Sequence, residues 1–326
     1  MVVSLVMTVL DEAGSLPALL DSILAQERRP DEVVIVDGGS SDRTVALARD
    51  FARRAAPDLP VRVEVLPGAN ISAGRNRAIE LAQGDIIVVT DGGVVLHAAW
   101  LARLVAALEA GADVAAGFFV PAPQSSFELA MGATVLPAVE DVAPATFLPS
   151  SRSVAFRRAA WGQAGRYPEW LDYCEDVVFD LALRREGVRQ RFVPAARVAF
   201  RPRPSLPAFF RQYYRYARGD GKADLWRRRH TIRYGVYLGA PLGWLLGPHW
   251  PVLRWLIVIA MLAYVRRPYR RLWALAAQSH GGTLGRFLRA AAWVPLIRLT
   301  GDVAKMVGYP VGVWWRLTAR HRQHSE

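Results

Sequence analysis

The chain has 326 residues, 52% of them hydrophobic, with a formal net charge of +12 and one cysteine, Cys174. This length suits one large domain with an appendage. A single cysteine excludes an intrachain disulfide and suits a reducing, cytosolic setting. The basic excess predicts an anionic partner, which leaves nucleic acid, anionic lipid and nucleotide diphosphate open. Met1 leads directly into an apolar run without a basic flank, so we expect no signal peptide.

The first two apolar runs predict a βαβ unit that delivers a carboxylate to one edge of a sheet. Residues 2–9 read as a strand, residues 16–24 repeat leucines at helical spacing, and residues 33–36 form a β-branched strand that ends at Asp37. Gly38 then lets the backbone turn sharply and approach a ligand closely. Ligands bind at this edge in open α/β sheets. A dinucleotide-binding fingerprint is excluded, because no Gly-x-Gly-x-x-Gly follows the first strand.

The next elements bring a cation and a second carboxylate toward the same edge. Residues 61–66 predict a strand, and residues 70–82 predict a helix with Arg75 in its opening turns. A cation there opposes the helix dipole, which favours an anion-holding role over a solvated surface arginine. Residues 85–89 predict another buried strand, and Asp91 follows it two residues later. A carboxylate at a strand end can hold Mg²⁺ or Mn²⁺.

Two acids begin a later helix. Glu175 and Asp176 directly precede a helical apolar pattern, so we expect them in its first turn. The helix dipole and the free N–H groups favour carboxylates there, so an ordinary helix start and a catalytic pair are both open. Before them, residues 113–120 and 150–158 predict strands, and residues 121–149 are rich in proline and weakly patterned.

These motifs, in this order, resemble those of the inverting, membrane-associated bacterial members of glycosyltransferase family 2. The motifs are Asp11-Glu12, Asp37 to Asp42, the Ala73-Gly74-Arg75-Asn76 segment, Asp91, and Glu175-Asp176 after the turn from Gly165 to Glu169. The resemblance covers about residues 2–222 and implies a GT-A fold, a three-layer α/β/α domain, over residues 1–205. The family usually carries Asp-x-Asp where this chain has Asp91 and Gly93.

The resemblance implies a role in sugar transfer for each motif. Asp176, beside Glu175, is the expected base that deprotonates the acceptor hydroxyl, and one base acting directly implies inversion. Asp91 is the expected ligand of a divalent cation, Mg²⁺ or Mn²⁺, although Gly93 removes the usual second carboxylate. The expected contacts to the nucleotide sugar come from Thr8, Leu10, Glu12, Asp37, Gly38, Arg75, Asp91, Gly92, Arg152, Arg215 and Arg218.

The C-terminal third differs in character. Residues 206–230 predict a basic, aromatic linker helix that carries Arg215 and Arg218; no recognition module accompanies it, so we expect no nucleic acid. We expect residues 231–326 to form a hydrophobic and amphipathic helical region associated with a membrane, because uncharged arms are flanked by arginines and tryptophans. Each arm is shorter than the roughly 20 residues of a spanning helix, so a spanning hairpin, an interfacial hairpin and a soluble helix pair stay open.

The sequence therefore predicts transfer of a sugar from a nucleotide-diphosphate sugar to a lipid-linked or polysaccharide acceptor in cell-envelope synthesis. The expected location is the inner membrane, with the catalytic domain in the cytoplasm. One alternative is a sugar-phosphate nucleotidyltransferase, which would need an arginine-containing, glycine-rich loop where the chain has residues 10–13. The other is a non-catalytic membrane scaffold, suggested by Gly93 in the metal motif.

Overall fold

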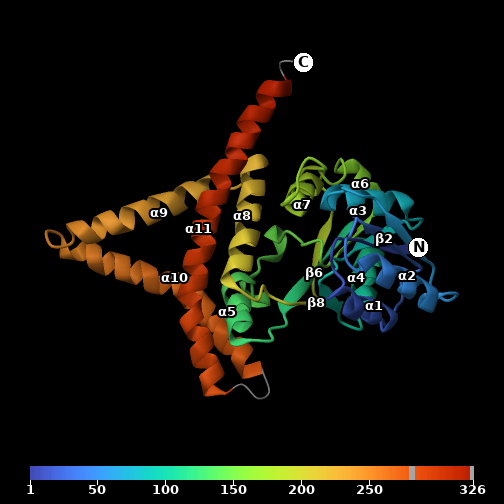
Figure 1. The fold of residues 1–326 in the computed structure, drawn as a ribbon, viewed down its shortest axis with the longest axis horizontal. Helices are drawn as coiled ribbons and strands as arrows, with labels where there is room; N and C mark the ends of the chain where they lie inside the picture. Colours follow the sequence, from blue (N-terminus) through green and yellow to red (C-terminus); the bar gives the residue numbers. More distant parts are fainter. Residues whose placement is uncertain (279–282, 324–326) are drawn as a thin grey trace. The chain divides into compact units, whose positions relative to one another are not determined.

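The computed structural model describes residues 1–278 and 283–323 and divides the chain into two units (Figure 1). The first contains residues 1–120 and 139–201, and the second contains residues 121–138 and the chain from Pro202 onward. The sequence predicts one uninterrupted domain over residues 1–205, whereas the structure assigns residues 121–138 to the helical unit.

The first unit is built on a mixed eight-stranded sheet with the order β3-β2-β1-β4-β7-β6-β8-β5. Its strands are β1 (Val3–Val9), β2 (Glu32–Asp37), β3 (Val61–Val65), β4 (Ile86–Val89), β5 (Val94–Leu96), β6 (Val114–Pro121), β7 (Val154–Arg157) and β8 (Gln190–Phe200). Strand β1 pairs in parallel with β2 and β4, and β2 pairs in parallel with β3. Strand β7 is antiparallel to both β4 and β6. Asp37 at the end of β2 pairs in register with Val9 of β1, so these two strands end side by side.

Helices cover both faces of this sheet. They are α1 (Leu16–Leu24), α2 (Thr44–Ala55), α3 (Ile71–Leu81), α4 (Trp100–Glu109), α6 (Arg158–Gln163) and α7 (Glu175–Arg185), with short 3-10 helices η1 (Val139–Asp141) and η2 (Pro144–Thr146). Val33 and Ile35 pack in the core beneath α1, α2 and α4, whereas Val34 and Val36 pack in the core beneath α3 and α7. Because successive side chains of a strand point to opposite faces, an unbroken apolar run is needed here. The predicted three-layer α/β/α architecture is confirmed for this unit.

The second unit is helical in the part that the structure describes. It contains α5 (Ser126–Val135), α8 (Leu206–Lys222), α9 (Arg227–Leu246), α10 (Pro251–Gln278) and α11 (Leu284–Gln323). Its core joins α5 to α10 and α11 through apolar side chains that include Met131, Leu272 and Ile297. The predicted linker helix over residues 206–230 is interrupted, since Asp224 and Trp226 adopt left-handed backbone conformations with φ of 60° and 56°.

Helix α5 lies inside the stretch that the sequence left without a pattern. All residues from Glu128 to Thr134 are buried, so polar and apolar positions do not alternate with the helical period. The N-cap is regular: the Ser125 side chain accepts a hydrogen bond from the Glu128 N–H. Burial on all sides therefore concealed this helix from pattern analysis.

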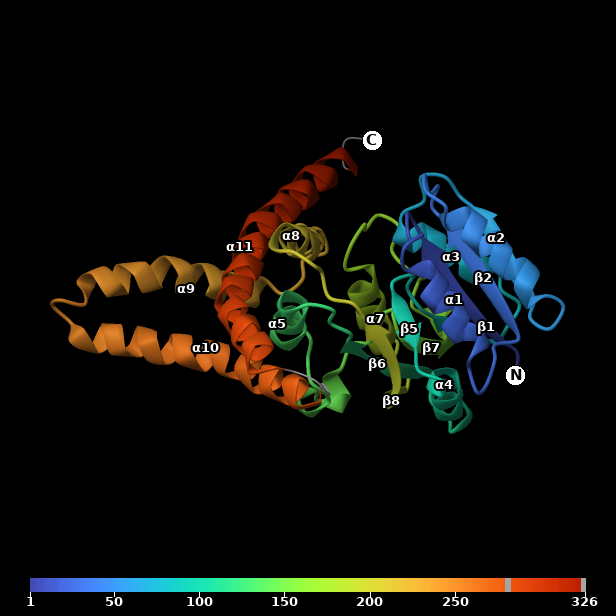
Figure 2. The same ribbon diagram turned by 60° about the horizontal axis from the view of Figure 1, so that its bottom comes forward.

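Helices α9 and α10 form an antiparallel hairpin that leads away from α11 and back to it (Figures 1 and 2). The turn between the two helices lies between Leu246 and Pro251. Large apolar side chains on both helices are exposed, among them Leu238, Leu242, Leu245, Trp255, Ile259 and Leu262. Within the described residues, no helix combines the length and the apolar character that crossing a membrane would require.

Candidate active site

The predicted motifs of the first unit meet at one edge of the sheet. Asp91 lies two residues after β4, Arg75 lies on α3, and Glu175 is the first residue of α7. Arg75 Nη2 donates to Asp91 Oδ1 at 2.7 Å, and Arg75 Nη1 donates to Glu175 Oε1 at 2.6 Å. One guanidinium therefore joins a strand end to a helix start 84 positions apart (175 minus 91) in the chain.

The Arg75 side chain is only 1% exposed, and both of its terminal nitrogens serve carboxylates. Its guanidinium also lies 5.4 Å from the centre of the Tyr167 ring. Burial alone would lower the pKa of Arg75, but Asp91 and Glu175 outweigh burial and raise it. Arg75 is thus a permanent internal cation whose hydrogen bonds fix the two carboxylates, and its predicted contact with a nucleotide stays a prediction.

Asp91 is more accessible, with 25% of its side chain exposed. Burial would raise its pKa, but Arg75 and Arg152 overcome this effect and keep the pKa below its ordinary value. Arg152 Nε lies 3.8 Å from Asp91 Oδ2, and its side chain is 20% exposed. The Arg152 guanidinium also lies over the Phe200 ring at 4.5 Å, which fixes its plane. Arg152 therefore reaches the predicted site and remains partly open to a ligand.

The acidic pair begins α7 as predicted. Cys174 takes a left-handed conformation at the N-cap, with φ of 66°, and Asp176 Oδ1 accepts the Val177 N–H at 2.9 Å. Burial, together with Asp176, raises the pKa of Glu175 to about 7 despite its bond to Arg75. Burial also raises the pKa of the half-buried Asp176, with Arg75 and Arg152 opposing the effect. A carboxylate whose pKa is shifted toward neutrality is a suitable proton acceptor.

Sequence analysis missed a third acid on α7. Asp180 lies one helical turn after Asp176, its residue is 3% exposed, and its Oδ2 has no hydrogen-bond partner among the described residues. Burial and the nearby Asp176 raise its pKa well above the ordinary value. An aspartate four positions after Asp176, within an apolar helical pattern, is the signal that could have identified it.

Asp37 is fully buried and is engaged by its own loop. Its Oδ1 accepts the N–H groups of Gly39 at 2.8 Å and Ser40 at 2.7 Å, and its Oδ2 accepts the Ser40 hydroxyl at 2.6 Å. A Cβ at Gly38 would lie 3.0 Å from the Ala69 carbonyl oxygen, so the close approach of the backbone favours glycine here. The motif thus shapes the loop after β2, and a nucleotide contact from Asp37 and Gly38 stays a prediction.

The residues at the end of β1 and directly after it are distributed around the same edge. Thr8 packs against Gly74 of α3, and the Glu12 side chain packs against Gly92, where an added Cβ would meet Glu12 Cγ at 3.1 Å. Leu10 is exposed. These residues line the ends of neighbouring strands, so their predicted role is compatible with their positions and stays a prediction. The other predicted contacts, Arg215 and Arg218, lie on α8 in the second unit.

The residues at the site fit a metal ion only in part. No cluster of three or more His, Cys, Asp or Glu side chains suited to a metal occurs in residues 1–278 and 283–323. Asp91 Oδ1 is taken by Arg75, so Oδ2 is the oxygen available to a cation. A Cβ on Gly93 would meet no atom of the described residues within 4 Å, so nothing there crowds position 93. Among the described residues, Asp91 therefore offers one carboxylate oxygen to a cation, and further ligands would come from a bound donor and water.

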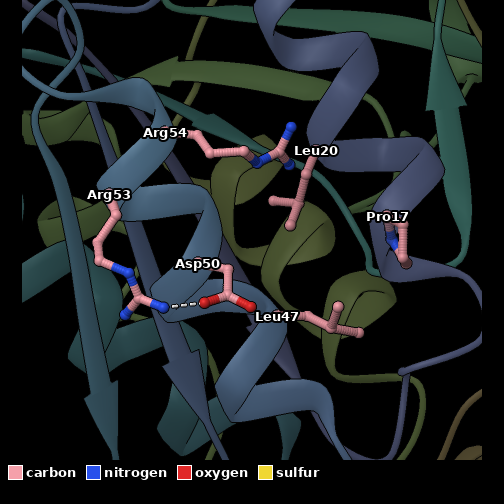
Figure 3. Close-up of a pocket in the computed structure, with 6 residues that line it drawn as sticks. All are labelled: Pro17, Leu20, Leu47, Asp50, Arg53 and Arg54. Carbon is pink, nitrogen blue, oxygen red and sulfur yellow. Dashed lines mark hydrogen bonds and ion pairs between the residues drawn. The ribbon is translucent and has the colours of Figure 1, made fainter.

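A cavity of about 470 Å³ lies elsewhere, between α1 and α2 (Figure 3). It is lined by Pro17, Leu20, Leu47, Asp50, Arg53 and Arg54. Arg53 and Asp50 pair with each other at its rim. It contains none of the predicted site residues, and we assign it no part in the chemistry.

Comparisons with known proteins agree with this geometry. The model of "Glycosyl transferase family 2" matches residues 4–158, and that of "Glycosyl transferase family group 2" matches residues 125–298. The succinoglycan biosynthesis protein ExoA of Rhizobium meliloti is 29% identical over 308 residues, which cover 84% of this chain and 89% of that protein. The uncharacterized glycosyltransferase EpsJ of Bacillus subtilis is 25% identical over 200 residues, 57% of each chain.

Among solved structures, the mannosyltransferase PcManGT of Pyrobaculum calidifontis, in complex with GDP-Man and Mn²⁺, aligns with a TM-score of 0.55 and 20% identity. The alignment covers 97% of this chain and 86% of that one, and it shows a shared fold. The family models together span the strand ends, Arg75, Asp91 and the start of α7. The chain therefore belongs to glycosyltransferase family 2, has a GT-A-like α/β fold, and is a glycosyltransferase.

Proposed function

We propose that this glycosyltransferase moves a sugar from a nucleotide-diphosphate sugar to an acceptor hydroxyl, with inversion and with Asp176 as general base. The observation that supports this proposal is the half-buried Asp176 carboxylate at the start of α7. It directly follows Glu175, which Arg75 links to Asp91. Neither alternative from the sequence explains this arrangement as well, since a scaffold needs no acid with a raised pKa and a nucleotidyltransferase needs a phosphate loop after β1.

Asp176 has one oxygen fixed and one unused. Its Oδ1 accepts the Val177 N–H, and its Oδ2 makes no hydrogen bond to the described residues. In the proposed reaction this carboxylate takes the acceptor hydroxyl proton as the acceptor oxygen bonds to the anomeric carbon. The bond from that carbon to the diphosphate breaks on the opposite face, so the configuration inverts.

The departing diphosphate needs positive charge. We assign this role to Arg152, because its guanidinium is partly exposed and lies beside Asp91. Arg75 acts as a positioning residue, since its terminal nitrogens hold Asp91 and Glu175. We further propose that Asp91 is the residue that would hold a divalent cation, which would supply additional positive charge to the leaving group. The donor contacts predicted for Arg215 and Arg218, which lie on α8 of the helical unit, stay predictions.

The proposed acceptor is a lipid-linked sugar or a growing polysaccharide at the cytoplasmic face of the inner membrane. The relative named for succinoglycan biosynthesis supports a polysaccharide product. The exposed apolar α9–α10 hairpin and the flanking arginines support association with an anionic membrane surface. Trp244, Trp250 and Trp255 are exposed on this hairpin, and tryptophan favours the boundary between lipid and water.

A donor panel tests the proposed reaction. The full-length protein in detergent is incubated with UDP-, GDP- and dTDP-sugars, with and without Mn²⁺, and free nucleotide diphosphate is measured. We expect release from at least one donor, and an anomeric NMR signal of opposite configuration in the transferred sugar. The proposal fails if every donor stays intact while the protein remains folded, or if the transferred sugar retains its configuration.

A further inference from the structure

A second group of charged side chains lies far along the chain from the active-site motifs, at the base of the α9–α10 hairpin. Within the helical unit, α9, α10 and α11 together bring the group into contact, and we call it the Asp302 cluster. Its members are Arg233 and Tyr237 of α9, Tyr264 of α10, and Arg298, Asp302 and Lys305 of α11. Neither the proposed reaction nor the sequence motifs use any of them.

The carboxylate at the centre of the cluster is fully engaged. Asp302 is 7% exposed, and its Oδ1 accepts Arg233 Nε at 2.8 Å. Its Oδ2 accepts the hydroxyl groups of Tyr237, at 3.0 Å, and Tyr264. Burial would raise the pKa of Asp302, but these donors and Lys305 keep it below the ordinary value. Arg233 is thereby the charge partner of Asp302.

Two cations then remain without an ionic partner in the described chain. The Arg298 guanidinium lies over the Tyr264 ring at 4.5 Å, and its buried Nε has no hydrogen-bond partner among the described residues. The Lys305 ammonium lies 4.9 Å from the centre of the Tyr213 ring and forms no ion pair within 4.0 Å in the described part of the chain. Burial lowers the pKa of Lys305 to about 8, with Asp302 opposing this shift and Arg233 and Arg298 adding to it.

The neighbouring acid, Asp220, offsets this excess only in part: its charge raises the pKa of Lys305, but burial, Arg233 and Arg298 still lower it. Asp220 Oδ2 of α8 lies 3.2 Å from His230 Nε2. On the other side of the ring, His230 Nδ1 accepts a hydrogen bond from Arg233 Nη1 at 3.1 Å. The histidine thus links Asp220 to Arg233, on the side of the cluster that is already paired. An uncompensated cation that is partly withdrawn from water is costly unless an anion joins it.

We propose that Arg298 and Lys305 bind the phosphate monoester headgroup of a membrane lipid. Two unpaired cations match a phosphate monoester, which carries about −1.5 to −2 charges at neutral pH, better than a phosphodiester with one. The guanidinium and ammonium groups supply donors for its oxygens. This inference extends the membrane association proposed above and assigns it a specific headgroup site.

The surroundings favour a lipid over a soluble phosphate. The two helices that leave the cluster carry exposed apolar side chains along their length, including Val236, Leu238, Leu256, Ile259, Met261 and Leu262. Residues 255–265 of α10 contain no charged side chain. A lipid with its phosphate at Arg298 and Lys305 could lay its hydrocarbon chains against this surface, which would remove apolar area from water.

Vesicle binding with charge-matched variants tests the site. The full-length protein is titrated with phosphatidylcholine vesicles that contain either phosphatidic acid, a monoester, or phosphatidylglycerol, a diester. The Arg298→Gln/Lys305→Met variant should lose the preference for phosphatidic acid, with affinity falling about tenfold or more, the scale of a lost charge-assisted hydrogen bond. The control, Arg228→Gln/Arg289→Gln, removes two exposed charges of the same unit and should weaken both vesicle types equally. Equal losses in the two variants, or equal binding of the native protein to the two vesicle types, would overturn the proposal.

Lysine labelling tests the same site without a membrane and in the unmodified protein. The chain has two lysines, Lys222 and Lys305, so an amine-reactive reagent read by mass spectrometry reports on each separately. Soluble dihexanoyl phosphatidic acid should slow labelling of Lys305 severalfold and leave Lys222 unchanged, whereas inorganic phosphate should protect Lys305 less. Protection by inorganic phosphate equal to that by the lipid would identify a soluble anion site instead, and no protection would exclude the site. If the protein ignores all vesicles but Lys305 is protected, the membrane association fails and the headgroup site stands.

Discussion

Arg75 shows how a single residue sets the electrostatics of the active site. Its guanidinium is shared by Asp91 and Glu175, yet the pKa of Asp91 falls while that of Glu175 rises. The reason is that Arg152 also lies beside Asp91, whereas Glu175 is more deeply buried and has Asp176 as its neighbour. Beside one internal cation, the pKa is thus lowered for the carboxylate at the strand end and raised for the two acids at the helix start.

The first prediction concerns the proposed base. Asp176→Asn preserves the size and the position at the start of α7 but removes the proton-accepting oxygen. We expect turnover to fall at least ~100-fold, the usual contribution of a general base, while nucleotide binding measured by calorimetry changes little. Glu186→Gln, at the exposed C-terminal end of the same helix, is the control and should retain native turnover. Turnover within a few-fold of native in Asp176→Asn would remove Asp176 from the mechanism.

The second prediction concerns Asp180 and pH. Its pKa is raised in the folded protein, so the folded state keeps a proton that the unfolded chain releases above the ordinary pKa of 3.8. Stability is therefore lost as pH rises from that value toward the raised pKa. Asp180→Asn removes this loss, so the free energy of unfolding of the variant relative to native should increase with pH. Urea unfolding at pH 5 and pH 8 measures it.

Asp58→Asn provides the control for this pH dependence, because Asp58 is exposed on the same unit. The free energy of unfolding of Asp58→Asn should differ from that of the native protein by the same amount at both pH values. If the difference for Asp180→Asn also does not change with pH, Asp180 is ionised in the folded state.

At the scale of elements, glycines set how closely α8 and α11 pack. An added Cβ at Gly308 would overlap the Tyr214 carbonyl, and one at Gly312 would overlap the Arg218 carbonyl. Gly221 of α8 faces the α11 backbone in the same way. Helix backbones can approach this closely only where side chains are absent. This close packing therefore fixes the position of α8, which carries Arg215 and Arg218, against α11.

The third prediction follows from this close approach. Gly308→Ala should destabilise the protein by about 1–3 kcal/mol, the usual cost of overpacking, as measured by thermal or denaturant unfolding. Gly285 lies on the same helix, and a Cβ there would meet no described atom within 4 Å. Gly285→Ala should therefore leave the free energy of unfolding unchanged or raise it by up to about 1 kcal/mol, because alanine favours the helix more than glycine does. Equal behaviour of the two variants would show that α8 and α11 do not pack this tightly in solution.

At the scale of the whole molecule, charge and apolar surface are unevenly distributed. The chain carries a net charge of +12, and many of its large exposed apolar side chains lie on α9 and α10 of the helical unit. Exposed apolar surface of this extent marks an interaction site in a folded protein. Together the two properties favour a binding partner whose surface is both apolar and negatively charged.

The fourth prediction tests this combination. Replacing Trp244, Trp250 and Trp255 by serine should weaken binding to phosphatidylcholine–phosphatidylglycerol vesicles at least about tenfold, because each loses apolar area that the lipid would cover. The loss should persist at high salt, where charge attraction is screened. Trp170→Ser, in the first unit, should bind as the native protein does. Vesicle flotation measures both, and unchanged flotation of the triple variant would exclude the hairpin as the membrane contact.

The sequence by itself determined the catalytic unit to a large extent. Buried parallel strands must be continuously apolar, so β1, β2 and β4 were readable, and parallel strands end at one edge, which predicted that Asp37, Asp91 and Arg75 would gather there. The position of Glu175 and Asp176 in the first turn of a helix followed from the apolar spacing after them. These features depend on local patterns and on one topological rule.

Only the tertiary structure decided which groups pair. Arg75 binds Asp91 and Glu175 instead of facing solvent, and Arg298 lies against Tyr264. Asp180 is buried, and its Oδ2 has no partner among the residues that the structure describes. Helix α5 likewise lacked a pattern because neighbours surround it on all sides. Such contacts join segments that are distant in the chain, and their energies depend on burial and on neighbouring charges, which no local pattern in the sequence encodes.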